Sequence, residues 1–183
     1  ILGLILDPHH TGNANAKSTL TKIPARAKVI KALTAPGFGL QKEDALITYR
    51  ATVEPVIGYG VPLWKTIISD TWIAKFQAAQ NNVLCNVLGC HAATSMDHLH
   101  QECKMMPVGQ HLDLQATQFL ASALRRSHPS HGIVTAPLAA RPRMKPSLKT
   151  AYGPALEPYL HEGIITEMNY KPTLTALHTS ATK

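Results

Sequence analysis

The stretch SDTWIAKFQAAQNNVLCNVLG, residues 69–89, carries the clearest structural pattern in the chain. Its apolar residues recur every three or four positions, the spacing of one face of an α-helix. These residues are Ile73, Phe76, Ala79, Val83, Leu84 and Val87. Ser69 or Asp70 can cap the start of such a helix, and Gly89 can end it. The pattern predicts an amphipathic helix whose apolar face must be covered by other elements.

A second amphipathic helix is expected over residues 17–34. Its apolar positions are Leu20, Ile23, Ala27, Ile30 and Leu33. Pro24 lies inside this segment, and an interior proline removes a backbone hydrogen bond, so we expect the helix to kink or to begin only near Pro24. After a Gly- and Pro-containing turn at 35–39, apolar residues between 46 and 57 predict another helix, which Pro55 should bend.

The other segments of the sequence also predict mostly helices. Further helices are expected over 97–104 and 112–126, and a short apolar corner over 59–64. Residues 1–6 are apolar and end at Asp7 and Pro8, which predicts a short β-strand followed by a turn. The sequence thus predicts a helical array with an N-terminal strand and a basic Pro-rich linker. We divide it into residues 1–16 (strand and turn), 17–126 (helical domain), 127–149 (linker) and 150–183 (short helical tail).

Composition narrows the classes of function. The chain has 183 residues, enough to bury a core, and a formal net charge of +7, which favours an anionic partner such as nucleic acid. No apolar run reaches the roughly 20 residues of a membrane helix, and residues 1–6 lack the features of a secretory signal. Three cysteines are too few for a disulfide scaffold, which favours a reducing compartment. The chain does not begin with Met, so we expect it to be cut from the interior of a longer protein.

Two groups of basic residues are candidates for phosphate contacts. Lys17, Lys28 and Lys31 fall within about 60° of one another on a helix, which predicts a basic stripe beside the apolar one. A second track combines Arg125, Arg126, Arg141, Arg143 and Lys145. The alternatives are a solvated lysine surface and an ordinary disordered tail. Tyr59 and Trp64 can stack on bases, but their apolar neighbours favour packing in the core.

Short motifs, taken in order along the chain, resemble the reverse transcriptases of jockey-like non-LTR (LINE-type) retrotransposons. The matching blocks lie at residues 2–8, 37–39, 42–43, 59–64, 80–81, 88–91, 97–102, 107–108, 128–131 and 148–178. The resemblance therefore spans nearly the whole chain and implies the region after the palm, with a primer grip at Leu2 and Gly3, a thumb and a connector. It departs from the family pattern at Phe38, at Cys85 and at Pro24.

The resemblance also implies a set of partners. These are RNA, RNA–DNA hybrid and the upstream palm and fingers of the same polypeptide, with an intracellular location in the cytoplasm and nucleus as a ribonucleoprotein. Polymerases of this kind hold divalent metal ions on paired aspartates. No such pair occurs here, because Asp7 precedes Pro8, while Glu43, Asp44 and Asp70 suit helix starts. We therefore expect no catalytic residue and no cofactor in this chain, with Mg²⁺ in the upstream palm, and an inactive fragment.

A cluster of thiols and imidazoles raises the question of zinc. It comprises Cys85, Cys90, His91, His98, His100 and Cys103. The spacing fits no standard zinc knuckle, and His98 and His100 would point to different faces of a helix. We expect no metal site; were zinc bound, its ligands would come from Cys90, His91, His98 and Cys103.

The sequence leads to one functional interpretation and two alternatives. The first is the thumb and connector part of a retrotransposon RNA-directed DNA polymerase, which binds the template–primer duplex through phosphate contacts. The second is a stand-alone basic helical fragment, from a decayed element, that binds nucleic acid or protein without catalysis. The third is a zinc-dependent binding module.

Overall fold

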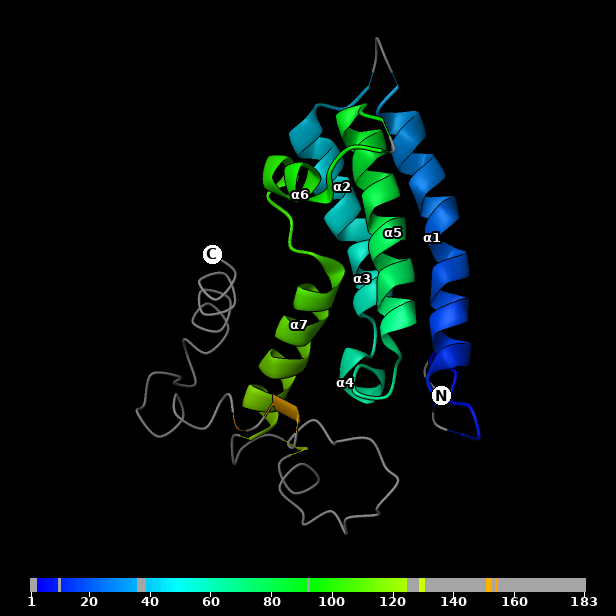
Figure 1. Ribbon diagram of the computed structural model, residues 1–183, viewed down its shortest axis with the longest axis vertical. Coiled ribbons are helices and arrows are strands. Elements are labelled where there is room, and N and C mark those ends of the chain that lie inside the picture. The colour runs from blue at the N-terminus through cyan, green and yellow to red at the C-terminus, as the bar shows by residue number, and fades with distance from the viewer. Residues whose placement is uncertain are drawn as a thin grey trace. The chain divides into compact units, whose positions relative to one another are not determined.

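The computed structural model describes residues 3–9, 11–35, 39–91, 93–124, 129–130, 151–152 and 154 (Figure 1). Between residues 13 and 123 it contains seven helical segments: α1 (Asn13–Leu33), α2 (Lys42–Thr52), α3 (Glu54–Gly58), α4 (Val61–Trp64), α5 (Asp70–Leu88), α6 (Met96–Cys103) and α7 (Val108–Ala123). The prediction of a mainly helical fold is confirmed.

The described helices belong to two compact units. The first lies within Ile1–Tyr59 and Ile68–Gly109, and the second within Gly60–Ile67 and Gln110–Lys183. The division into four parts made from the sequence, including the Pro-rich linker at 127–149, stays a prediction.

The N-terminal β-strand is not found in its described part, Gly3 to Leu6, which forms a turn and irregular chain. A strand needs a partner strand, and the described residues contain none. The backbone N–H of Ile5 donates instead to the side-chain oxygen of Asn15, at 3.3 Å. Asp7 ends the segment by accepting 2.8 Å hydrogen bonds from the backbone N–H and the hydroxyl of Thr11. The hydrogen bond from the Thr11 backbone, followed by that from its hydroxyl, lowers the pKa of Asp7 below its ordinary value.

In the first unit, α1 packs most extensively against α5, and the two helices run parallel (Figure 1). Hydrogen bonds join them at both ends. Near the start of each helix, the Trp72 indole N–H donates to the side-chain oxygen of Asn13 at 2.8 Å. Near the end, the Thr34 hydroxyl lies 3.4 Å from the carbonyl oxygen of Asn86. Because α1 and α5 run in the same direction, the chain must return from the end of α1 to the start of α5. Helices α2 and α3 form this return path.

The helix boundaries follow local chemistry. Gly89 ends α5 in the left-handed conformation, with φ 65°, as predicted. Ser69 stands at the N-cap position, but its side chain makes no capping hydrogen bond. Helix α2 is separated from α3 at Val53, and Pro55 occupies the first turn of α3, where its missing N–H costs nothing. The single helix with a bend at Pro55 that the sequence predicted is therefore two helices, divided at Val53.

Pro24 does not delay the start of α1, which begins at Asn13 and continues through the proline. That expectation was wrong because buried residues hold the helix on both sides of Pro24. They are Asn15, Ala16, Thr19 and Ile23 before it, and Ala27 and Ile30 after it. Tertiary packing of this face outweighs the roughly 3 kcal/mol that an interior proline costs.

A buried polar network holds α6 and the following loop against α5. The Gln77 amide oxygen accepts the backbone N–H of Val108 at 2.8 Å, while its nitrogen lies 3.0 Å from Nε2 of His100. Gln80, only 2% exposed, donates to the carbonyl oxygen of Met106 at 3.2 Å. Nδ1 of His100 lies 2.9 Å from the carbonyl oxygen of Met105, so it donates there as an N–H. Buried backbone groups of the loop are thereby paired.

The second unit contains α4 and the part of α7 from Gln110 onward. Trp64 is 4% exposed, which confirms the prediction that it packs in the core. Asp113 forms an ion pair with Lys65 at 2.9 Å and accepts a hydrogen bond from the Tyr152 hydroxyl at 2.7 Å. Burial, followed by the hydrogen bond to Asp113, raises the pKa of Tyr152 well above its ordinary value.

Two glycines provide a matched test of the fold of the first unit. A Cβ at Gly39 would lie 2.5 Å from the carbonyl oxygen of Ala35, whereas a Cβ at Gly109 would meet Ile73 Cγ2 at an ordinary 3.6 Å. We therefore expect Gly39→Ala to lower the free energy of unfolding by about 1–3 kcal/mol, since backbone must move. Gly109→Ala should raise it by up to about 1 kcal/mol, because alanine is the better helix former. Urea unfolding followed by circular dichroism measures both, and equal effects of the two substitutions would contradict this packing.

Candidate nucleic-acid interface

The predicted basic stripe lies on α1. Lys17, Lys28 and Lys31 are all exposed, and the apolar residues Ile23, Ala27 and Ile30 occupy the buried face of the same helix. From Lys17 to Lys31 the helix rises about 21 Å. We call these three lysines the outer row. Their contact with nucleic acid stays a prediction.

A second basic row on α1 was missed in the sequence. Lys22 and Arg26 are four residues apart, so they lie one turn apart, on the other flank of the buried face. The guanidinium of Arg26 donates to the carbonyl oxygen of Lys22 at 3.1 Å. The four-residue spacing of Lys22 and Arg26 is the signal in the sequence that indicates this row. We call Lys22 and Arg26 the inner row.

The inner row lines an open groove of about 280 Å³ between α1 and α3. Its lining residues are Gly3, Asn15, Thr19, Lys22, Arg26, Pro55, Val56 and Tyr59. Tyr59 is 53% exposed, so the expectation that it packs in the core was wrong. The physical reason is that α3 ends at Gly58 and Tyr59 continues in extended backbone, with φ −66° and ψ 122°. The groove thus brings two cations and an exposed aromatic ring together.

Other predicted residues lie outside the described part of the chain. They are Leu2 of the proposed primer grip, and Arg125, Arg126, Arg141, Arg143 and Lys145 of the second basic track. Gly3 is described: it has φ 83°, and a Cβ there would lie 3.7 Å from Cε1 of Tyr59.

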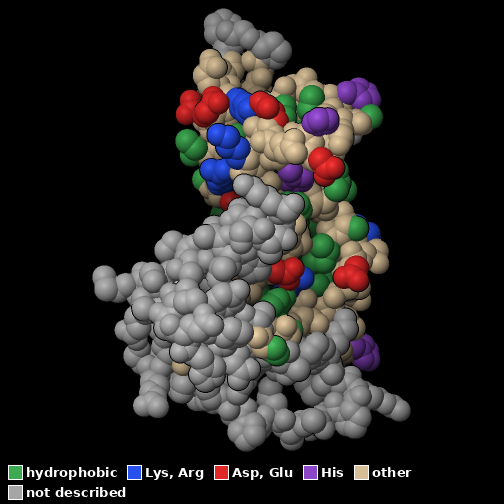
Figure 2. All heavy atoms as spheres, turned by 60° about the vertical axis from the view of Figure 1, so that its left-hand side comes forward, with side chains coloured by type: hydrophobic (Ala, Val, Ile, Leu, Met, Phe, Trp, Pro, Cys, Tyr) green, Lys and Arg blue, Asp and Glu red, His purple; other side chains and the backbone are tan. Residues whose placement is uncertain are grey.

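The face drawn in Figure 2 has no continuous basic patch among its described side chains. Lys and Arg side chains there lie close to Asp and Glu side chains. Among the described residues, the two rows of α1 are the candidates for phosphate contacts.

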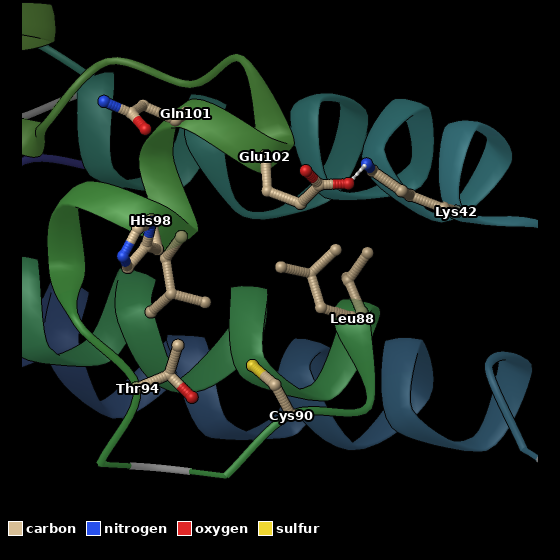
Figure 3. A pocket seen from close by; sticks show the side chains of 9 residues that line it. Lys42, Leu88, Cys90, Thr94, His98, Gln101 and Glu102 are labelled. Carbon is tan, nitrogen blue, oxygen red and sulfur yellow. Dashed lines mark hydrogen bonds and ion pairs between the residues drawn. The ribbon is translucent and has the colours of Figure 1, made fainter.

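A larger cavity of about 520 Å³ lies where the end of α5 meets α6 and the start of α2 (Figure 3). Its charged residues, Lys42 and Glu102, form an ion pair with each other. The hydrogen bond between them raises the pKa of Lys42 and lowers that of Glu102. Because each charge is matched by the other, this cavity is a poor site for phosphate. The sulfur of Cys90 points into it.

The zinc candidates are not gathered into a ligand set. Cys90 and His98 line the same cavity, whereas Cys103 is buried in α6 and the Nδ1 of His91 accepts the backbone N–H of Ala93 at 3.1 Å. Across the described residues, no three His, Cys, Asp or Glu side chains are grouped to hold a metal ion.

The acidic residues considered in the sequence occupy structural positions. Glu43 and Asp44 lie in the first turn of α2, and Asp70 opens α5, where carboxylates interact favourably with the helix dipole. Asp7 is bonded to Thr11. Each of these four carboxylates thus has a local structural role.

Comparison with known proteins gives one informative similarity. Over 140 residues, 70% of this chain, the sequence is 29% identical to a probable RNA-directed DNA polymerase from transposon X-element of Drosophila melanogaster. The chain is similar to part of a transposon-encoded polymerase. It spans 15% of that protein's length. No protein-family model and no solved structure matches the chain. No helix in the described residues is long and apolar enough to cross a membrane.

The three cysteines should differ in reactivity, because alkylation requires an accessible thiolate. Burial, followed by a hydrogen bond with Cys90, raises the pKa of Cys85 to about 11, and burial also raises that of Cys103. Cys90 is partly exposed and lines the open cavity. We expect iodoacetamide at pH 8 to modify the folded chain at Cys90 first, as read by peptide mass spectrometry. Cys90→Ser should remove this fast phase, and rapid modification of Cys85 or Cys103 in the folded chain would contradict it.

Proposed function

We propose that the chain is the thumb and connector part of a jockey-like non-LTR retrotransposon RNA-directed DNA polymerase, and that it binds the RNA template–primer duplex through phosphate contacts. The observation that carries the proposal is the outer row on α1, in a chain similar to a transposon-encoded polymerase. Lysines along one helix can contact successive phosphates of a duplex without reading its sequence.

The geometry of α1 supports this mode of binding. The buried face of the helix is fixed against α5, so the outer row is presented from a rigid support. Lys28 and Lys31 lie about 4.5 Å apart along the helix axis, and Lys17 lies about 16 Å from Lys28. Each lysine is a compact charge on a flexible stem, suited to phosphates whose positions vary.

In such a polymerase, the residues that carry out the chemistry would lie upstream of this chain. Paired aspartates of a palm would hold Mg²⁺ there. The described residues of this chain would bind the duplex and take no part in the chemical step. The partners are RNA, RNA–DNA hybrid and the palm and fingers of the same polypeptide. The corresponding location is intracellular, in the cytoplasm and nucleus, within a ribonucleoprotein.

Salt dependence tests the phosphate contacts directly. Each phosphate neutralised by a lysine releases counterions, so affinity falls steeply with salt. We expect Lys28→Gln combined with Lys31→Gln to reduce the slope of log affinity against log salt by about two, one for each lost contact, and to weaken RNA–DNA hybrids of every sequence alike. Fluorescence anisotropy with labelled hybrids between 50 and 300 mM salt measures both quantities.

A matched control separates specific contacts from net charge. Lys75→Gln combined with Lys104→Gln removes the same charge from exposed lysines that lie on α5 and after α6. This control should leave the slope nearly unchanged. If both double variants reduce it equally, or if neither does, the outer row does not hold phosphate and the proposal fails.

A further inference from the structure

We propose that the groove between α1 and α3 binds one unpaired nucleotide of a single-stranded RNA or DNA segment, with its base stacked on Tyr59 and its phosphate held by Lys22 and Arg26. This inference rests on the proposed function, because it assumes that the chain binds nucleic acid. It assigns a second site, distinct from the outer row of α1.

The groove has the charge that a nucleotide requires. Among the described residues that line it, Lys22 and Arg26 are positive and none is negative. The two cations are separated by one helical turn, about 6 Å along the axis, so both can face phosphates of one short segment of strand. Arginine presents several N–H groups in a plane, and one of them already bonds to the carbonyl oxygen of Lys22. That bond fixes the guanidinium on the wall of the groove.

The aromatic ring supplies a platform for a base. Tyr59 is 53% exposed at the edge of the groove, and Pro55 and Val56 form an apolar wall beside it. Gly3 also lies next to the ring, because a Cβ at Gly3 would be 3.7 Å from Cε1 of Tyr59. Glycine at this position lets the N-terminal chain approach the ring without a side chain between them. Base stacking on such a ring contributes about 1–3 kcal/mol and tolerates any base.

The size of the groove selects a single nucleotide rather than a duplex. Its volume of about 280 Å³ lies at the lower limit of ligand pockets, roughly 300–1,000 Å³. In a duplex the base faces are covered by neighbouring base pairs, whereas an unpaired base can place its face on a side chain. Asn15 and Thr19 also line the α1 wall, but both are buried, so the accessible contacts of the groove come from Lys22, Arg26 and Tyr59. The occupant we infer is therefore an unpaired segment, such as a template overhang.

The test compares binding of a labelled single-stranded oligouridine and of a blunt RNA–DNA hybrid by the whole chain. We expect Tyr59→Leu to weaken single-strand binding at least about fivefold while changing hybrid binding less than about twofold. Tyr59→Phe should bind the single strand nearly as wild type does, because the ring remains. Lys22→Gln with Arg26→Gln should weaken single-strand binding and reduce its salt slope. Ile47→Ala, at an exposed apolar residue of α2, serves as a control with no expected effect.

The outcomes separate the two proposals. If wild type binds the hybrid but Tyr59→Leu leaves single-strand affinity unchanged, or if Tyr59→Phe loses as much as Tyr59→Leu, the groove site is overturned and the proposed function stands. If wild type binds neither ligand, both fail. Photocrosslinking of wild type to an oligonucleotide that contains 5-iodouracil avoids variants altogether. It should label Tyr59, and labelling confined to other residues would overturn the site.

Discussion

The parallel pairing of α1 and α5 is the constraint on which the first unit depends. Hydrogen bonds between Asn13 and Trp72 at one end, and between Thr34 and Asn86 at the other, fix the two helices in direction and register. Two parallel helices cannot be joined by a short turn, so α2 and α3 must span the distance back. That return path places α3 beside α1, where the inner row and Tyr59 line one groove.

A second constraint acts at the other face of α5. Gln77 and Gln80 bond to backbone groups of the loop after α6, so this loop has one register against the helix. An apolar contact would tolerate small shifts, whereas an unpaired buried N–H or carbonyl costs about 1–3 kcal/mol. His100 joins the same network from α6, where both of its ring nitrogens lie within hydrogen-bond distance of polar partners.

Local sequence patterns predicted the individual helices better than they predicted which helices pack against one another. Helix α5 was predictable because its apolar spacing, its start near Ser69 and its end at Gly89 agree. The continuation of α1 through Pro24 was not predictable from the local pattern. It depends on packing against α5, whose residues lie more than forty positions further along the chain. The exposure of Tyr59 and its meeting with Lys22 and Arg26 were equally hidden, since they require the return of α3 to α1. The outer row was predictable from helical geometry alone.

If α1 presents the nucleic-acid surface of this chain, bound nucleic acid should shield its lysines from chemical modification. Lysine acetylation with and without a bound RNA–DNA hybrid that carries a single-stranded overhang, followed by peptide mass spectrometry, tests it for all the lysines in one experiment. Bound nucleic acid should protect Lys17, Lys22, Lys28 and Lys31, while Lys75 and Lys104 should react as in the free chain. Protection of Lys75 and Lys104 without protection of the α1 lysines would contradict it.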